Sequence, residues 1–353
     1  MVVDLSARKK LILKAIISEY IRTAEPVGSK SVASRPELGF SSATIRNEMS
    51  ELEEMGYLQK THTSSGRIPS AKGYRLYVDE LMGLPDLTSA DINSINTVTK
   101  LKVKELDRLI SEAGRLISDL TNYTTLAVTP VMQRVTLRRF EIISVDSVNF
   151  VIVAVTDSGV VKNKMIRTVC PVAKEEAELL TYVLNQTLTG IPIEEITKER
   201  FDIVRRAAGM TALLKPIGEF LEDLLEELST QKLYLQGASK LLSQPEYRDV
   251  AKAQAMLDYI GDSSHVPALR RFTREIDGVR ITIGPENGAE PLENASMVYA
   301  TYNIGTVGRG LIGIVGPTRM DYGRLSARLS LFSQGLNKLI AATFFDELED
   351  DQE

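Results

Sequence analysis

Cysteine and histidine are scarce in this chain of 353 residues, which has one cysteine, Cys170, and two histidines, His62 and His265. One cysteine cannot build the disulfide framework that is typical of small secreted proteins, so we expect a reducing, cytoplasmic location. The two histidines lie in different predicted domains and no Cys/His cluster accompanies them, which argues against a zinc site. We therefore expect neither a metal nor a cofactor.

Long apolar runs and catalytic motifs are missing as well. No run of about 18 uninterrupted apolar residues occurs, so no membrane-spanning segment is expected. The sequence has no G-x-S-x-G, no H-E-x-x-H and no Walker-type glycine loop. Gly305, Gly308 and Gly310 have the wrong order for a dinucleotide fingerprint, and Ser6 and Lys9 match Ser-x-x-Lys, a pattern so short that it arises by chance. The protein is predicted not to be an enzyme.

The chain as a whole also lacks an excess of positive charge, since its net charge is −5. The charges are unevenly distributed, however. Residues 1–78 hold 12 Lys/Arg and 8 Asp/Glu, whereas the remaining 275 residues hold 30 and 39. Positive charge attracts the phosphates of nucleic acid, so the N-terminal part is the candidate for DNA binding. The length predicts two or three domains.

The most informative stretch runs from Phe40 to Arg75. Ser41 or Ser42 can cap a helix, and apolar residues then recur at helical spacing until Gly56, which suits a helix stop. These apolar residues are Ile45, Met49, Leu52 and Met55. The opposite face carries hydrogen-bonding side chains near the helix start, where a recognition helix contacts base edges: Thr44, Arg46, Asn47 and Ser50.

Two short extended runs follow this helix, Tyr57–His62 and Arg67–Pro69, with a Ser/Gly turn between them. Helices expected over about 6–23 and 30–34 precede it. Three helices and a hairpin make a winged helix-turn-helix. Taken alone, the spacing does not distinguish a DNA-binding domain from another small helical domain, because any such domain can have an amphipathic helix and a hairpin.

The remainder of the chain alternates between helical and extended patterns. Strands are expected at 138–145, 150–156, 160–168, 233–235, 279–283, 297–302 and 310–315. Helices are expected at about 90–120, 173–228, 246–260 and 325–342. The helical block at 173–228 is more apolar than three strands need, so the block is interpreted as a candidate subunit interface. A wide apolar face near its end consists of Phe220, Leu221, Leu224, Leu225 and Leu228.

Five sequence runs resemble the heat-inducible transcription repressor family, HrcA. They are TAEPVGSK at 23–30, ATIRNEMSELEEMGYL at 43–58, HTSSGRIPSAKGYRLYVD at 62–79, LLSQPEYRDV at 241–250 and GIVGPTRMDYGR at 313–324. The resemblance covers nearly the whole chain. It implies a homodimeric repressor of heat-shock chaperone operons that binds the CIRCE inverted repeat and depends on the GroEL chaperonin.

The resemblance also implies a GAF-like domain with an inserted dimerisation domain, so the expected fold class is multidomain α+β. The expected boundaries are 1–85 for the winged helix, 86–131 with 231–345 for the GAF-like domain, 132–230 for the inserted domain and 346–353 for an acidic tail.

The candidate DNA contacts are assigned by side-chain chemistry. Arg46 and Asn47 are predicted to contact bases, since a guanidinium suits guanine and a carboxamide suits adenine. Thr44, Ser50 and Lys72 are predicted to hold phosphates, and Arg67 to enter the minor groove. The remaining candidates are Ser42 at the helix start and Thr61 and His62 in the wing.

Two other functions stay open at this point. The first is a winged-helix regulator whose GAF-like domain binds a small metabolite, for which the loop Gly316–Tyr322 could supply a site, although a plain strand-to-helix turn is favoured there. The second is an RNA-binding or scaffolding protein, against which the lack of an aromatic stacking platform counts mildly.

Overall fold

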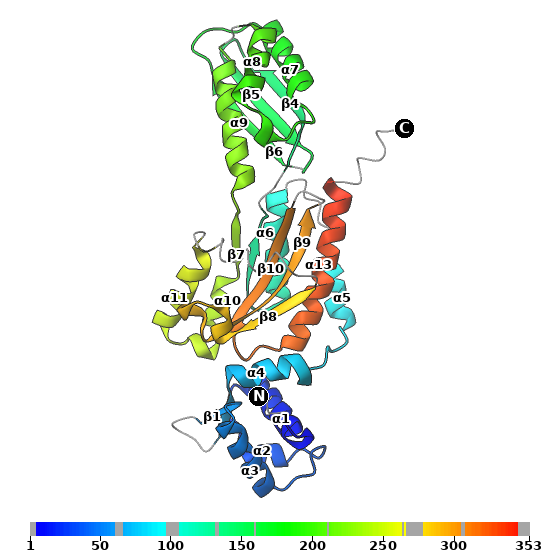
Figure 1. Ribbon diagram of the computed structural model, residues 1–353, viewed down its shortest axis with the longest axis vertical. Coiled ribbons are helices and arrows are strands. Elements are labelled where there is room, and N and C mark those ends of the chain that lie inside the picture. Colours follow the sequence, from blue (N-terminus) through cyan, green and yellow to red (C-terminus); the bar gives the residue numbers. More distant parts are fainter. Residues whose placement is uncertain are drawn as a thin grey trace.

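The structure is a computed structural model that describes residues 5–60, 66–96, 106–130, 134–158, 160–209, 212–262, 265, 278–304 and 308–344. Figure 1 shows three parts along one long axis, with the N-terminal helices at one end and the block that contains β4–β6 at the other. The wing turn at 61–65, the middle of the predicted long helix at 97–105, the turn at 305–307 and the acidic tail lie outside the described residues.

The N-terminal part is a winged helix. Its elements are α1 (Ala7–Thr23), α2 (Ser29–Ala33), α3 (Ser42–Glu54), β1 (Leu58–Lys60) and β2 (Arg67–Pro69). The two strands are antiparallel, with Leu58 opposite Pro69 and Lys60 opposite Arg67. Gly56 has a φ of +78°, the left-handed conformation that ends a helix at low cost. The predicted winged-helix fold is confirmed.

Three helical segments connect the winged helix to the rest. They are α4 (Ala71–Leu76), which continues as one π-helical turn (Tyr77–Leu81), then α5 (Ser89–Asn96) and α6 (Leu106–Thr121). Ser70 caps α4 through its hydroxyl, which accepts from the Gly73 amide at 3.1 Å. The helix expected over 90–120 is described at its two ends, as α5 and α6, and its middle lies outside the described residues.

The central part is built on a five-stranded antiparallel sheet with the order β7-β3-β10-β9-β8. The strands are β3 (Thr124–Val128), β7 (Leu233–Gln236), β8 (Val279–Ile283), β9 (Ala295–Ile304) and β10 (Gly308–Pro317). The sequence prediction missed β3, which pairs with both β7 and β10. This α+β arrangement fits the expected GAF-like fold.

Helices cover both faces of this sheet. Ile312 and Ile314 of β10 belong to one hydrophobic cluster with α6 and with α13 (Tyr322–Phe344). Leu311 and Val315 belong to another cluster with α10 (Ala238–Leu242) and α11 (Val250–Gly261). Alternate residues of one strand therefore serve opposite faces, as the pleat requires.

The chain leaves the central sheet after β3 and returns to it at β7. Between them lies a separate three-stranded sheet with three α-helices and a short 3-10 turn. The elements are β4 (Leu137–Ser144), β5 (Asn149–Thr156), β6 (Val161–Arg167), α7 (Lys174–Leu188), Ile193–Glu195, α8 (Lys198–Ala208) and α9 (Leu214–Ser229). Its hydrophobic cluster is distinct from those of the central part.

The apolar face of α9 packs inside the block, and the predicted subunit interface of the block stays a prediction. Phe220, Leu221, Leu224 and Leu228 are buried inside the block itself, and the Phe220 ring meets the Phe140 ring edge-on at 5.9 Å. Only Leu225 of that face is exposed. The apolar stripe of α9 is therefore the core of this block. The block nevertheless leaves other large apolar side chains in solvent: Ile143, Val145, Val161, Met165, Val169, Leu179, Tyr182 and Ile203.

Candidate nucleic-acid interface

The recognition helix α3 is held by a cap and a buried stripe. The Ser41 hydroxyl accepts from the Thr44 amide at 3.1 Å, which satisfies one of the free amides at the helix start. Ile45, Met49 and Leu52 are buried in one cluster with the apolar face of α1. This packing fixes which face of α3 remains outside.

The outer face carries the side chains that the sequence singled out. Arg46, Asn47 and Ser50 are exposed. Thr44 and Ser42 are half-buried, and each has a hydroxyl neighbour, Ser41 at 2.9 Å and Ser29 at 3.1 Å respectively. Arg46 and Asn47 therefore project from α3 with room for a partner, whereas the two hydroxyls also serve the helix start.

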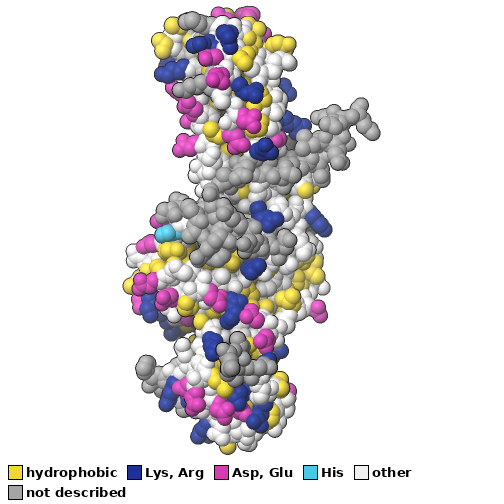
Figure 2. All heavy atoms as spheres, in the orientation of Figure 1, with side chains coloured by type: hydrophobic (Ala, Val, Ile, Leu, Met, Phe, Trp, Pro, Cys, Tyr) yellow, Lys and Arg dark blue, Asp and Glu magenta, His cyan; other side chains and the backbone are white. Residues whose placement is uncertain are grey.

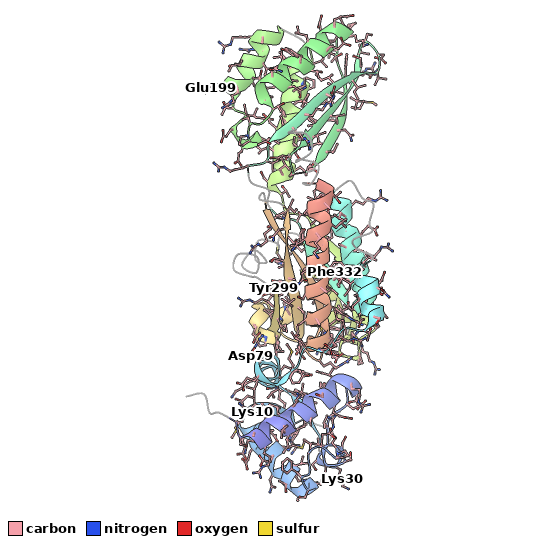
Figure 3. The ribbon with its side chains drawn as sticks, turned by 90° about the vertical axis from the view of Figure 1, so that its right-hand side faces the viewer. Lys10, Lys30, Asp79, Glu199, Tyr299 and Phe332 are labelled. Atoms are coloured by element: carbon pink, nitrogen blue, oxygen red, sulfur yellow. The ribbon has the colours of Figure 1, made fainter. Side chains whose placement is uncertain are left out.

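A cation that the sequence analysis did not single out lies near this helix start. Lys30 of α2 is exposed, and it is next to Ser29, whose hydroxyl contacts Ser42. Figure 3 shows Lys30 at the free end of the winged helix. Lysine is a common phosphate ligand, so Lys30 joins the candidate contacts. The signal available in the sequence was its place in the helix before the recognition helix.

The basic first turn of α1 is paired with carboxylates. Glu48 of α3 is buried and contacts Arg8 Nε at 2.5 Å and Lys9 Nζ at 2.9 Å. Lys9 also contacts Glu51 at 2.7 Å, and Lys10 contacts Glu80 at 2.8 Å. The hydrogen bond from Lys9 is the main cause that lowers the pKa of Glu48. These cations join α1 to its neighbours, which accounts for them without a phosphate.

The two basic residues predicted after the recognition helix also have protein partners. Arg67 Nε donates to Glu53 Oε2 of α3 at 2.6 Å, and its side chain is only 15% exposed. A minor-groove contact would require this ion pair to open, so the structure favours a structural role for Arg67 and its DNA contact stays a prediction. Lys72 donates to the Met55 carbonyl at 2.8 Å and lies 4.3 Å from the Tyr57 ring centroid, yet it remains exposed.

The charges on this part of the surface are mixed. Figure 2 shows acidic and basic side chains next to one another on the winged helix, on the face in view, rather than one continuous basic patch. Thr61 and His62 lie outside the described residues, so their predicted contacts stay predictions. Among the residues that the structure describes, no group of three or more His, Cys, Asp or Glu side chains could hold a metal ion, and none of their helices is long and apolar enough to cross a membrane.

Comparison with known proteins gives concordant results. Residues 4–80 match the family model "Winged helix-turn-helix transcription repressor, HrcA DNA-binding", and residues 107–325 match "HrcA protein C terminal domain". The chain is 38% identical to the "Heat-inducible transcription repressor HrcA" of Ruminiclostridium cellulolyticum over 341 residues, which is 95% of this chain and 97% of that protein. It is also 38% identical to the repressor of the same name from Acetivibrio thermocellus over 328 residues, 92% of this chain and 93% of that one.

A solved structure shares the fold. A crystal structure described as that of a hypothetical protein matches with a TM-score of 0.65 at 24% identity, over 96% of this chain and 98% of that one. At this identity the match supports the fold alone.

Proposed function

The chain belongs to the HrcA family of heat-inducible transcription repressors, and from this we propose that it represses chaperone operons as a homodimer bound to the CIRCE inverted repeat. The observation that carries the proposal is the outer face of α3, where Arg46 and Asn47 are exposed on a helix whose opposite side is buried. In a winged helix this is the face that enters the major groove.

The candidate side chains divide into base contacts and phosphate contacts. Arg46 and Asn47 would contact bases, because a guanidinium suits guanine and a carboxamide suits adenine. Lys30, Thr44, Ser50 and Lys72 would hold phosphates on either side of the groove, with Ser42 at the helix start. The wing residues Thr61 and His62 would contact the neighbouring backbone or minor groove.

The dimer is proposed to form through the block at about 132–230, as the family resemblance implies. One recognition helix reads only a few base pairs, and an inverted repeat mirrors two-fold symmetry in the protein. Large apolar side chains remain exposed on this block, among them Met165, Val169 and Tyr182. Burying such surface is what a stable homodimer interface does.

The response to heat is proposed to involve the GroEL chaperonin, again following the resemblance. The physical hypothesis is that the regulatory body is marginally folded, so that heat depletes the DNA-competent dimer as the chaperonin is diverted to other clients. If purified dimer stayed folded and bound to the operator at heat-shock temperature without chaperonin, this hypothesis would be wrong. Such a repressor acts in the cytoplasm, where its operators are.

The first experiment is a gel shift of the purified protein with the inverted repeat, a scrambled duplex of the same composition and a single half-site. We expect tight binding to the repeat, weaker binding to the half-site and only salt-sensitive binding to the scrambled duplex. Equal affinity for the repeat and the scrambled duplex would contradict the proposal.

Two variants separate the assigned roles. Arg46→Ala should cost roughly 1–3 kcal/mol on the operator and relax sequence preference, whereas Lys72→Ala should weaken all duplexes alike. Arg115→Ala is the control, because Arg115 pairs with Glu112 within α6, away from the recognition helix. Equal losses on specific and random DNA for both test variants would show that the roles are assigned wrongly.

A second candidate function is control by a small metabolite. A cleft of about 680 Å³ lies between the segment after α4 and the central part, and its lining includes Arg75, Arg280, Ser330 and Gln334. Its wall combines the charged side chains of Arg75 and Arg280 with apolar side chains such as Met82 and Leu331. A rise in the melting temperature with a small ligand, together with a change in operator affinity, would support this function.

A further inference from the structure

The winged helix sits on the central part through one continuous hydrophobic cluster, which includes apolar residues of α1 and α3 as well as of β8, β10 and α13. At the junction the rings of Tyr74 and Tyr322 meet edge-on, with centroids 5.9 Å apart and an angle of 70° between planes. Both rings are buried. In Figure 1, α4 lies between the winged helix and the central sheet, and Figure 3 shows Asp79 at the same junction. The winged helix therefore packs directly against the central part, which is called the body below.

A bidentate ion pair crosses this junction beside the two rings. Arg75, in the last turn of α4, donates from Nε to Glu286 Oε1 at 2.8 Å and from Nη2 to the other oxygen of the same carboxylate. Nη2 also donates to the Ile281 carbonyl at 2.8 Å, and Nη1 donates to Asp79 Oδ1 at 3.1 Å. A guanidinium held by two parallel bonds fixes direction as well as distance. Arg75 thus sets how α4 lies against β8.

The carboxylate that receives Arg75 is itself held in place. Glu286 lies in a short turn, Gly284–Asn287, where it also accepts from the Ile283 amide at 2.9 Å. Asn287 is buried, and its amide nitrogen lies within hydrogen-bond distance of the carbonyls of Gly284, Leu292 and Ala295, which ties the turn to the chain that follows it. The anchor for Arg75 is therefore rigid.

Close packing places this turn against the winged helix. Gly284 has a φ of +57°, and a Cβ there would lie 2.8 Å from the Glu293 carbonyl oxygen and 3.5 Å from Ala71 Cβ of α4. The positive φ and the close Glu293 oxygen require glycine at this position, and Ala71 lies at ordinary van der Waals distance. The contact of this turn with Ala71 and the ion pair of Glu286 with Arg75 therefore both hold the turn against α4.

A second tie lies in the loop that leads into α13. Arg319 pairs with Glu246, receives support from Gln244 at 3.1 Å, and reaches the Ile21 carbonyl of α1 at 3.5 Å. The last carbonyls of a helix have no partner within it and carry partial negative charge, so a cation is favourable there. The winged helix is held through α4 and through the end of α1, and two separated ties resist rotation better than one.

We propose that Arg75 is a positioning residue that holds the winged helix on the body and thereby sets the half-site spacing that the dimer accepts. This inference rests on the proposed function. In a dimer joined elsewhere, the separation of the two recognition helices depends on the angle at each junction between winged helix and body. A loosened junction lowers the effective concentration of the second subunit's winged helix at its half-site. The binding of one winged helix to one half-site does not depend on this angle.

The test compares wild type, Arg75→Met and Glu286→Gln on three duplexes: the operator, the operator with its spacer lengthened by about five base pairs, which is half a helical turn, and a single half-site. We expect both variants to bind the operator roughly tenfold more weakly, because the second subunit's winged helix is no longer held over its half-site. Half-site affinity should stay within about twofold of wild type, and the difference between normal and lengthened spacers should shrink. Arg115→Met is the matched control, because it removes an arginine whose pair with Glu112 lies within one helix.

Each result has one meaning. Operator and half-site weakened equally, or a spacer preference as sharp as that of wild type, would overturn the inference. Should Arg75→Met fail to fold by circular dichroism, Glu286→Gln decides, since it keeps the shape of the turn and removes only the charge. If the wild type does not prefer the inverted repeat to a scrambled duplex, the proposed function fails; if it does and the variants keep its spacer profile, only this inference fails.

Discussion

Replacing Glu48 by glutamine tests whether the basic start of α1 serves the fold or the DNA. Glu48 is 4% exposed and joins α3 to α1 through Arg8 and Lys9. Removing one partner of a buried ion pair costs ~3–5 kcal/mol when the other charge is left buried and alone. Here Lys9 keeps Glu51 at 2.7 Å and Arg8 is half exposed to solvent, so neither cation is stranded. The amide also keeps one acceptor, and we expect a loss of about 1–2 kcal/mol.

The measurement is urea unfolding followed by circular dichroism, for Glu48→Gln, Lys9→Met and the double variant. A coupling free energy near ~1 kcal/mol between the two positions is expected from direct contact. The matched control is Glu51→Gln, which removes a carboxylate from the same lysine at an exposed position and should cost well under ~1 kcal/mol.

Binding to the operator gives the second readout of this variant. If Glu48 held Arg8 and Lys9 back from phosphates, removing its charge would free two cations and tighten binding to every duplex. The structure predicts at most a small gain, because Lys9 still pairs with Glu51 and both cations lie against α3. Unchanged stability combined with tighter DNA binding would refute the reasoning.

Three further predictions concern the scaffold. Gly73→Ala should destabilise by roughly 3 kcal/mol or slightly more in urea unfolding, since its Cβ would lie 2.3 Å from the Tyr57 carbonyl oxygen, which is backbone and cannot move aside cheaply. Phe220→Ala should cost ~3–5 kcal/mol by the same measurement, because the ring is fully buried. Burial opposes ionisation of Asp91, but hydrogen bonds from Thr88 and Arg328 lower its pKa from 3.8 to about 2. The contribution of Asp91 to the free energy of unfolding is therefore present above about pH 4 and is lost as pH falls toward 2. In Asp91→Asn, the free energy of unfolding should change less over this pH range than in the wild type.

The winged helix could be predicted from the sequence because its signals are local. A capping serine, a stripe at helical spacing and Gly56 define α3 within about 15 residues. Strand β3 shows the opposite case. Thr124–Val128 is buried at every position, so it lacks the alternation of apolar and polar residues that marks a strand with one solvent-exposed face. Its partners, β7 and β10, lie more than 100 residues further along the chain.

The partners of the basic side chains at the site could not be predicted from the sequence for a related reason. A helical wheel shows that Arg46 and Asn47 face away from the stripe, and the structure has both exposed. It does not show that Arg67 meets Glu53, or that Arg8 and Lys9 meet Glu48, because these pairs depend on the angle at which elements pack. The sequence alone therefore does not show which basic side chains are already paired with a carboxylate.

The pairing of cations bears on where operator affinity comes from. Arg8, Lys9, Lys10 and Arg67 each have a carboxylate partner, so each would have to give up that partner to neutralise a phosphate. A winged helix with a basic excess of four charges, part of it engaged in this way, has limited non-specific attraction for DNA. In the proposed dimer, tight and selective binding would then depend on two recognition helices that meet two half-sites at once. Such avidity is lost when the two winged helices cannot reach their half-sites together. The packing of the winged helix on the body is therefore as important as the side chains that contact bases.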